Sequence, residues 1–216
     1  MIPYQYISIE GNIGAGKSSL AVMLAEEFNS RLVLEEFAEN PFLRKFYESP
    51  DRYAFPLELS FLSERFSQLK REVISGDIFQ PQVVSDYFLA KCQIFAKNNL
   101  QGDEYALFLK LYEVISTVCP SPDLLVYLYR DVRHLQDNIR RRGRDYEQNI
   151  SDTYLDGIQQ QYLDFLKQHQ HLRILIIQLD DMDFVANRSD YEWLRNVLCQ
   201  KYELGLHLID TPKANS

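Results

Sequence analysis

The sequence contains little cysteine, and the three residues present, Cys92, Cys119 and Cys199, form no C-x-x-C pair. An odd number of cysteines without such spacing is typical of neither a disulfide framework nor a structural zinc site. The four histidines also lack ligand spacing with thiols or carboxylates. We therefore predict a cytoplasmic protein from a reducing compartment, in which the cysteines are small buried apolar residues.

Long apolar runs are missing as well. No stretch approaches the roughly 20 residues that a membrane-spanning helix needs, and the N-terminus lacks the pattern of a signal peptide. The formal net charge of −8 opposes the binding of nucleic acid or anionic lipid through counterion release. We expect a soluble protein without a nucleic-acid or membrane partner, in which any polyanionic ligand is held by a local basic cluster.

Glycine is scarce, with eight residues in the chain, but three of them fall within residues 11–16. They form the pattern G-x-x-x-x-G-K-[ST] over residues 11–18, between an apolar run at residues 7–9 and a helical pattern at residues 20–25. This arrangement predicts a phosphate-binding loop, in which backbone N–H groups and a helix N-terminus surround an anion. The alternative is a glycine-rich turn that fits by chance, but the flanking strand and helix favour the loop.

The loop assigns chemical roles to its residues. Lys17 is expected to reach the β- and γ-phosphates of a nucleotide, and the Ser18 hydroxyl to bind the Mg²⁺ that bridges them. The predicted nucleotide-binding residues are Gly11, Asn12, Ile13, Gly14, Ala15, Gly16, Lys17, Ser18 and Ser19.

Five short runs rich in β-branched and aromatic residues alternate with helical patterns. Several of them are continuously apolar, which is typical of strands covered by helices on both faces. No proline-, glycine- and serine-rich linker divides the 216 residues. The pattern predicts one α/β domain over residues 1–216, with a five-stranded parallel sheet and right-handed crossovers. The expected strands are residues 6–10, 31–35, 82–86, 124–129 and 173–179.

The residues that follow these runs are unusually polar and acidic. Because ligands bind beyond the carboxyl ends of parallel strands, these positions are candidates for the site. Two long helices are expected nearby, over residues 52–75 and 86–99, and core packing rimmed by ion pairs is the simplest account of their polar faces. The strand-end residues are Glu10, Glu35, Glu36, Asp86, Arg130 and Asp131.

Four arginines and one glycine occupy residues 140–144 of this acidic chain. Such a run is usually a solvated face. Guanidinium groups also suit the negative charge that spreads over a phosphoryl group during its transfer, and the glycine can act as a hinge. We interpret the segment as an arginine-rich lid over the phosphates.

An ordered series of segments resembles the deoxynucleoside kinase family, specifically its bacterial deoxyadenosine/deoxyguanosine kinase-like branch. The resemblance implies a P-loop kinase fold, a homodimer, and transfer of the γ-phosphoryl group of ATP, with Mg²⁺, to the 5′-hydroxyl of a deoxynucleoside. The matching segments span nearly the whole chain: residues 9–18, 35–37, 40–42, 46–47, 53–55, Arg65, residues 94–96 and 142–148.

The resemblance also implies roles for single residues. Glu35 corresponds to the general base that takes the 5′-hydroxyl proton, with the adjacent Glu36 as the alternative. Tyr47 and Glu147 resemble the pair that binds the sugar 3′-hydroxyl. The other implied roles are contacts to the base edge by Glu58 and Arg65, base stacking by Phe95, catalysis by the lid arginines Arg142 and Arg144, and contact with the donor adenine by Asp183 and Phe184.

The sequence departs from the family pattern at three places. After the third strand many members carry Glu-Arg-Ser, whereas this chain has Ser-Asp-Tyr without the arginine, and we assign Asp86 to Mg²⁺. Lys91 stands near the family's base-pairing aspartate and is expected to contact the substrate. Glu58 replaces a glutamine, and because an ionised carboxylate only accepts hydrogen bonds, we predict a purine acceptor with guanine favoured over adenine.

Two other functions remain open at this point. A nucleoside monophosphate kinase of the thymidylate type shares the loop and the lid, but it needs basic groups for the acceptor phosphate, for which Arg65 and Lys91 are the candidates. A non-catalytic P-loop regulator is the second alternative. The second-strand carboxylate, the pair of Tyr47 and Glu147, and the lid argue against a regulator.

Overall fold

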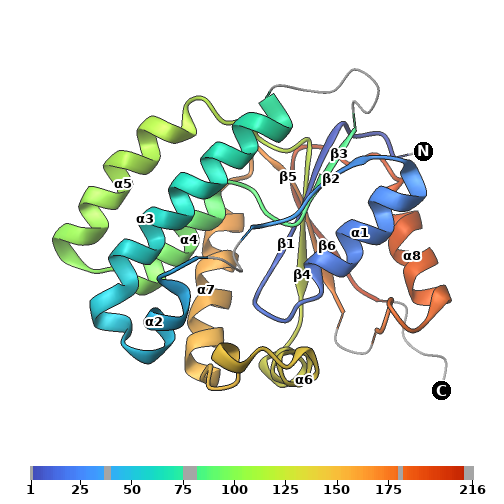
Figure 1. The fold of residues 1–216 in the computed structure, drawn as a ribbon. Helices are drawn as coiled ribbons and strands as arrows, with labels where there is room; N and C mark the ends of the chain where they lie inside the picture. Colours follow the sequence, from blue (N-terminus) through green and yellow to red (C-terminus); the bar gives the residue numbers. More distant parts are fainter. Residues whose placement is uncertain (1, 37–39, 75–81, 180–181, 212–216) are drawn as a thin grey trace.

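The fold is built on one six-stranded sheet in which every pair of neighbouring strands is parallel. The computed structural model describes residues 2–36, 40–74, 82–179 and 182–211 (Figure 1). The strand order is β2-β3-β1-β4-β5-β6. The strands are β1 (Tyr6–Gly11), β2 (Arg31–Val33), β3 (Val83–Ser85), β4 (Leu124–Tyr129), β5 (Arg173–Gln178) and β6 (Gly205–Ile209).

Helices cover both faces of this sheet (Figure 1). They are α1 (Lys17–Phe28), α2 (Leu43–Glu48), α3 (Pro50–Leu69), α4 (Ala90–Asn99), α5 (Gly102–Ser116), α6 (Val132–Arg142), α7 (Asp152–Gln168) and α8 (Arg188–Leu198). Among the described residues, none of the helices combines the length and the apolar character needed to cross a bilayer.

Alternate residues of the central strands point into two different cores. Val126 and Leu128 of β4 pack with residues of α1 and α8, whereas Leu125 and Tyr127 pack with residues of α4 and α7. This two-sided burial is the reason why the strand sequences read as continuous apolar runs. A third cluster joins α3 and α5 to the outer side of α4.

The sixth strand corrects the prediction of five. β6 lies at the edge of the sheet and pairs only with β5 among the described strands, and Leu208 within it is 70% exposed. Its sequence includes a histidine between two leucines, so it lacks the continuous apolar signal of the inner strands. The other five strands lie where they were expected, although β2 and β3 have only three residues each.

Two predicted helices have different boundaries in the structure. The helix expected over residues 52–75 begins at Pro50 and continues past Leu69 into a π-helical turn, Lys70–Ile74, while Ser75 lies outside the described residues. The helix expected from Asp86 begins only at Ala90. The backbone N–H of Phe88, between β3 and α4, instead donates to the buried Glu10 carboxylate at 2.9 Å.

A pair of substitutions in neighbouring strands tests the sheet order. Ile177→Ala removes a side chain with no exposed surface from β5 and should lower the free energy of unfolding by about 2–5 kcal/mol. Leu208→Ala in the edge strand should lower it by about 0.5 kcal/mol or less. Chemical denaturation followed by circular dichroism measures both values. Equal losses would contradict the edge position of β6.

Candidate active site

Two glycines of the loop between β1 and α1 have backbone conformations that other residues adopt poorly. Gly14 has φ +83°, and a Cβ on it would lie 2.7 Å from the Leu135 carbonyl oxygen. Gly16 has φ +95° and is packed against the ring of Phe184. α1 begins directly after Gly16, so its first N–H groups face the loop. The local geometry is that of a phosphate-binding loop.

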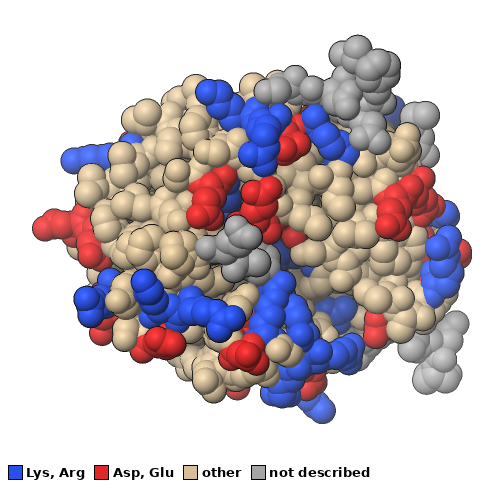
Figure 2. Space-filling view, in the orientation of Figure 1, with Lys and Arg blue, Asp and Glu red and all other residues tan. Residues whose placement is uncertain are grey.

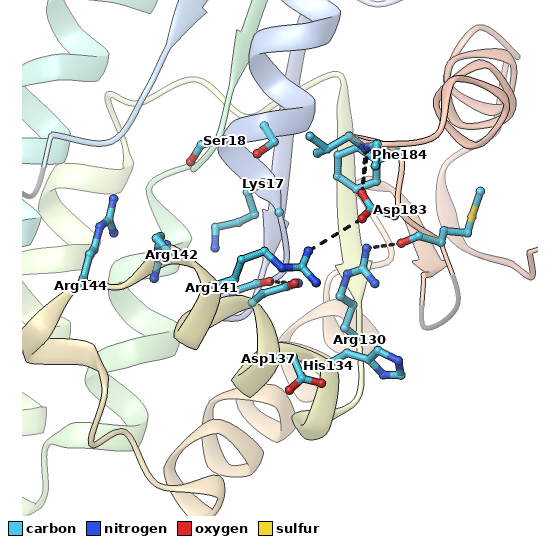
Figure 3. Close-up of a pocket in the computed structure, with 17 residues that line it drawn as sticks. Lys17, Ser18, Arg130, His134, Asp137, Arg141, Arg142, Arg144, Asp183 and Phe184 are labelled. Atoms are coloured by element: carbon cyan, nitrogen blue, oxygen red, sulfur yellow. Dashed lines mark hydrogen bonds and ion pairs between the residues drawn. The ribbon is translucent and has the colours of Figure 1, made fainter.

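A cavity of about 770 Å³ opens in front of this loop (Figure 3). Its walls are the loop, α6 and the segment after β5. Of the predicted nucleotide-binding residues, those that line it are Gly14, Gly16, Lys17, Ser18, Ser19, Asp183 and Phe184.

The remaining predicted loop residues support the loop from behind or face elsewhere. Asn12 is buried and donates from its side chain to the Leu155 carbonyl at 2.8 Å, and Ala15 is also buried. Gly11 packs against the backbone of β4. Ile13 lines a second cavity, which adjoins the first and is described below. Thus Gly11, Asn12 and Ala15 shape the loop but do not line the first cavity.

Basic side chains gather around the first cavity even though the protein is acidic. Figure 2 shows Lys and Arg concentrated over α6 and the lid. The cavity is lined by Arg130, Arg141, Arg142 and Arg144 together with Lys17. Burial and repulsion from Lys91 lower the pKa of Lys17 to about 8, and its Nζ donates to the Asn12 carbonyl at 2.8 Å. This is the local basic cluster that a polyanionic ligand of an acidic protein requires.

Arg130 is a site residue to which the sequence assigned no role. Its guanidinium donates to the carbonyls of Leu179 at 2.6 Å and Met182 at 2.7 Å, and it thereby holds the segment that carries Asp183 and Phe184 (Figure 3). Its position directly after β4 was the only sequence signal. Arg141 also faces this segment, with 3.8 Å between its guanidinium and the Asp183 carboxylate.

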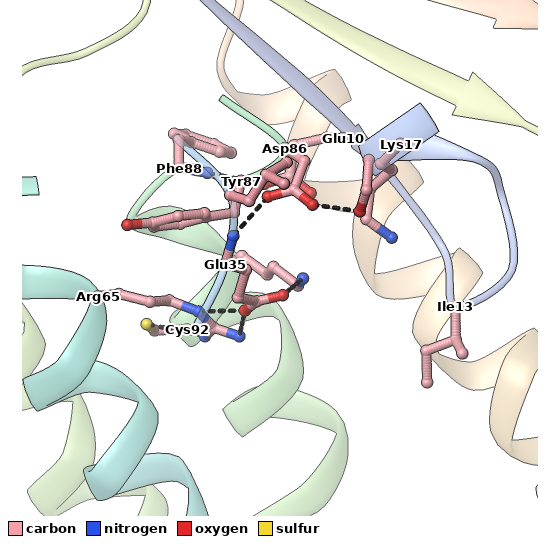
Figure 4. A network of polar contacts seen from close by, with 12 residues as sticks. Glu10, Ile13, Lys17, Glu35, Arg65, Asp86, Tyr87, Phe88 and Cys92 are labelled. Carbon is pink, nitrogen blue, oxygen red and sulfur yellow. Dashed lines mark hydrogen bonds and ion pairs between the residues drawn. The ribbon is translucent and has the colours of Figure 1, made fainter. Parts of the chain in front are cut away.

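Ser18 and Asp86 meet beside the loop, and Figure 4 shows the position of Asp86 there. The Ser18 hydroxyl donates to one oxygen of Asp86, and the other oxygen accepts the backbone N–H of Glu35 at 2.8 Å. A hydroxyl and a carboxylate are the hard oxygen ligands that Mg²⁺ prefers. Within the described ranges no cluster of three or more His, Cys, Asp or Glu side chains forms a metal site. Two protein ligands fit Mg²⁺, because it usually keeps several waters and binds substrate phosphates.

A second cavity, of about 110 Å³, adjoins the first. The structure brings all the predicted substrate-binding residues together in its walls, although they come from five different segments. They are Glu35, Tyr47, Glu58, Arg65, Lys91, Phe95 and Glu147.

Glu35 sits between two buried cations in this cavity (Figure 4). Its Oε1 accepts from Arg65 Nε at 2.7 Å, and its Oε2 accepts from Lys91 Nζ at 2.5 Å. Burial alone would raise the pKa of Glu35, but Arg65 and Lys91 outweigh it and lower the pKa to about 2. The Glu36 side chain is 70% exposed, with only the exposed Arg71 as an ion-pair partner among the described residues. The geometry therefore favours Glu35 over Glu36 as the general base.

The residues that are predicted to contact the base of the substrate divide into two groups. Arg65 and Lys91 are both engaged with Glu35, and the Lys91 ammonium also lies 5.7 Å from the centre of the Phe95 ring. Glu58 stands apart from these ion pairs and is 1% exposed. Burial raises the pKa of Glu58 to about 7. Its partner is Asn99, at the end of α4, which the sequence did not indicate.

The lid residues are paired with each other in this conformation. Glu147, in a short 3₁₀ turn Asp145–Glu147, accepts hydrogen bonds from Arg142 and, at 3.2 Å, from Arg144. Arg142 is the last residue of α6, and Arg144 follows it after Gly143, which caps the helix with φ +70°. Tyr47 stacks on Tyr146 with 6.0 Å between ring centres. The predicted sugar pair and the lid therefore share one wall of the second cavity.

Comparison with known proteins decides the family. A model of the deoxynucleoside kinase family matches residues 7–201. The chain belongs to this family. As a deoxynucleoside kinase it is a phosphotransferase that acts on a hydroxyl acceptor, and both the resemblance seen in the sequence and the predicted activity are confirmed.

Several relatives of this kinase are named for purine deoxynucleosides, and one of Bacillus subtilis is named for both deoxyadenosine and deoxycytidine. A deoxyguanosine kinase of Bacillus subtilis is 35% identical over 195 residues, which cover 87% of this chain and 92% of the relative. A deoxyadenosine kinase of Dictyostelium discoideum is 30% identical over 200 residues, covering 92% of this chain and 79% of the relative. A structure described as deoxyadenosine kinase from M. mycoides with bound dATP has a TM-score of 0.75 at 24% identity, and the match covers 89% of this chain and 98% of that chain. This similarity confirms the α/β fold with its parallel sheet between helices.

Adjacent carboxylates provide a matched test of the general base. Glu35→Gln keeps the shape of the side chain but removes its ability to take a proton, so kcat should fall about 10²- to 10⁴-fold. Glu36→Gln, on an exposed side chain, should leave kcat within about 2-fold of the parent. Steady-state phosphoryl transfer gives both values, and nucleoside binding measured by calorimetry controls for misfolding. A larger loss in Glu36→Gln would exchange the two assignments.

Proposed function

We propose that this deoxynucleoside kinase transfers the γ-phosphoryl group of ATP, with Mg²⁺, to the 5′-hydroxyl of a purine deoxynucleoside, with guanine favoured. The observation that carries the proposal is the junction of the two cavities. Four residues line both of them, namely Lys17, Ser18, Arg142 and Arg144. Positively charged groups and the proposed metal ligand Ser18 therefore stand where a donor phosphate in one cavity would meet an acceptor hydroxyl in the other.

The donor side of the proposal rests on the loop. Lys17 and the first N–H groups of α1 would bind the phosphates, Ser18 and Asp86 would hold Mg²⁺, and Phe184 with Asp183 would contact the adenine. ATP bound there supplies the phosphoryl group, and Mg²⁺ neutralises its charge. Arg142 and Arg144 would leave Glu147 and turn towards the charge that develops on the transferring group.

The acceptor side places Glu35 beside the junction. Because Arg65 and Lys91 keep Glu35 ionised at neutral pH, its carboxylate is always in the form that accepts a hydrogen bond from the 5′-hydroxyl. A low pKa makes it a weak base. In a loose transition state the hydroxyl proton leaves late, so orientation of the oxygen contributes more than early removal of the proton.

Glu58 supports the preference for guanine. The edge of guanine presents two adjacent donors, N1–H and the 2-amino group, to which an ionised carboxylate is complementary. Adenine would place its N1 acceptor against the carboxylate. The similarity to a deoxyguanosine kinase supports the same choice. A monophosphate acceptor is less compatible with the site, because Arg65 and Lys91 are already bound to Glu35.

The proposal includes a homodimer and a cytoplasmic location. One face of α5 and the turn after it carries exposed apolar side chains, which suits contact with a second copy. Free cysteines among the described residues agree with a reducing compartment. The apolar side chains are Leu107, Leu111, Val114 and Val118, each at least 41% exposed.

The direct test is phosphoryl transfer from ATP to the four deoxynucleosides and their ribonucleoside counterparts. We expect kcat/KM to be highest for deoxyguanosine, followed by deoxyadenosine. Lys17→Ala should abolish transfer while leaving the melting temperature nearly unchanged, because the lysine acts through its charge at the phosphates. Lys167→Ala, on an exposed position of α7, is the matched control and should behave as the parent. Transfer only to a nucleoside monophosphate, or to none of these acceptors, would refute the proposal.

The base preference has its own test at Glu58. Glu58→Gln supplies one donor and one acceptor, which suits adenine, so the ratio of kcat/KM for deoxyguanosine over deoxyadenosine should fall at least about 10-fold. Glu104→Gln, at an exposed position of α5, should leave the ratio unchanged. If the parent prefers a pyrimidine, or if Glu58→Gln keeps the ranking, Glu58 does not read the base.

A further inference from the structure

The buried end of the second cavity contains a carboxylate with one unused oxygen. Glu58 is 1% exposed, and its Oε1 accepts a hydrogen bond from Asn99 Nδ2 at 2.7 Å. Its Oε2 has no hydrogen-bond partner among the described residues. A buried carboxylate oxygen without a partner is costly to the folded protein, which indicates that a ligand completes its hydrogen bonding.

The Asn99 amide is oriented by its neighbour Asn98 in α4, which packs against α7. Asn98 Nδ2 donates to Asn99 Oδ1 at 3.1 Å. The Oδ1 atom of Asn98 lies 2.6 Å from the position that a Cβ on Gly157 would occupy, so a larger residue at this point of α7 would displace the Asn98 side chain. With its carbonyl oxygen engaged by Asn98, the Asn99 amide is oriented with its NH₂ group towards Glu58.

Resting on the proposed function, we propose that Asn99 is a specificity-determining residue that keeps Glu58 as an acceptor-only edge and thereby selects guanine over adenine. It acts through Glu58 and is a positioning residue. The NH₂ group can only donate, so it binds an ionised carboxylate or the carbonyl oxygen of a protonated one. Its bond to Oε1 fixes the rotamer of Glu58 and leaves Oε2 for the N–H groups of the base.

The surroundings of Glu58 show why this contact matters near neutral pH. Burial raises the pKa of Glu58, and Glu35 adds to this effect, whereas Asn99, Arg65 and Lys91 lower it. Tyr154 of α7 also lines the cavity and interacts with both Asn99 and Glu58. Loss of the Asn99 bond would therefore raise the pKa of Glu58 and leave more of it protonated at pH 7.

A protonated Glu58 would reverse the preference for the base. Its O–H could donate to N1 of adenine while its carbonyl oxygen accepts from the 6-amino group. With guanine, the same O–H would face an N–H donor of the base, and two donors cannot form a hydrogen bond with each other. Without Asn99 the site is thus expected to accept adenine better and guanine worse.

The experiment compares Asn99→Ala with the parent between about pH 6 and pH 9, a range that spans the pKa of Glu58. The measured quantity is the ratio of kcat/KM for deoxyguanosine over deoxyadenosine. At pH 7 the ratio should fall about 10-fold in Asn99→Ala, the effect of losing one hydrogen bond to a charged group. The pH at which the ratio changes should also move upward. Asn196→Ala, at an exposed position of α8, should leave both unchanged.

A second variant changes the position of Asn99 without replacing this residue. Gly157→Ala displaces Asn98 and should lower the ratio in the same direction, while melting temperatures report whether each variant folds. An equal fall in kcat/KM for both nucleosides, or a ratio that Asn99→Ala leaves unchanged, would overturn the proposal and show that Asn99 only supports the fold.

Calorimetric binding of deoxyguanosine and deoxyadenosine separates this inference from the proposed function. If Asn99→Ala shifts the ratio of the two dissociation constants as expected but no phosphoryl transfer occurs, the inference stands and the proposed activity is wrong. If the parent phosphorylates deoxyguanosine and Asn99→Ala has the selectivity of the parent in both binding and transfer, the activity stands and the inference is wrong.

Discussion

The carboxylate of Asp86 is the contact on which the arrangement of the site depends. One of its oxygens binds the Ser18 hydroxyl in the first turn of α1, and the other binds the backbone N–H of Glu35 after β2. β3 lies between β2 and β1 in the sheet, so a side chain that follows β3 can reach both neighbours. Because parallel strands end at the same edge, this single residue joins the proposed donor and acceptor sides of the site.

Buried charges keep this arrangement rigid. Glu10 in β1 is fully buried, and it binds the backbone of Phe88 and, at 2.8 Å, the Tyr162 hydroxyl. Burial raises its pKa, while the nearby cations Lys91 and Lys17 oppose that rise. Removing one of these two hydrogen-bond donors from a buried carboxylate typically destabilises a protein by about 1–3 kcal/mol. The site is thus held in position before a substrate binds, as electrostatic catalysis requires.

Much of the fold and part of the site followed from local patterns. The phosphate-binding loop was recognisable because glycine spacing, a preceding strand and a following helix are all close in sequence. Five strands were found because their burial on both faces makes them continuously apolar, and β6 was missed because an exposed edge strand does not need that pattern. The roles of the site residues came from the family resemblance and stay predictions, although their convergence on two cavities is a property of the structure.

The sequence by itself determined the parallel α/β class, the position of the loop, the family, and a carboxylate beyond the second strand. Only the tertiary structure distinguishes the surroundings of Glu35 from those of Glu36, because the cations that bind Glu35 come from α3 and α4 and not from the chain next to it. It also brought Asn99 to Glu58, 41 residues away, through the packing of α4 on α3 and α7. Such contacts depend on which faces of distant helices pack together, and a local pattern of residues does not determine this packing.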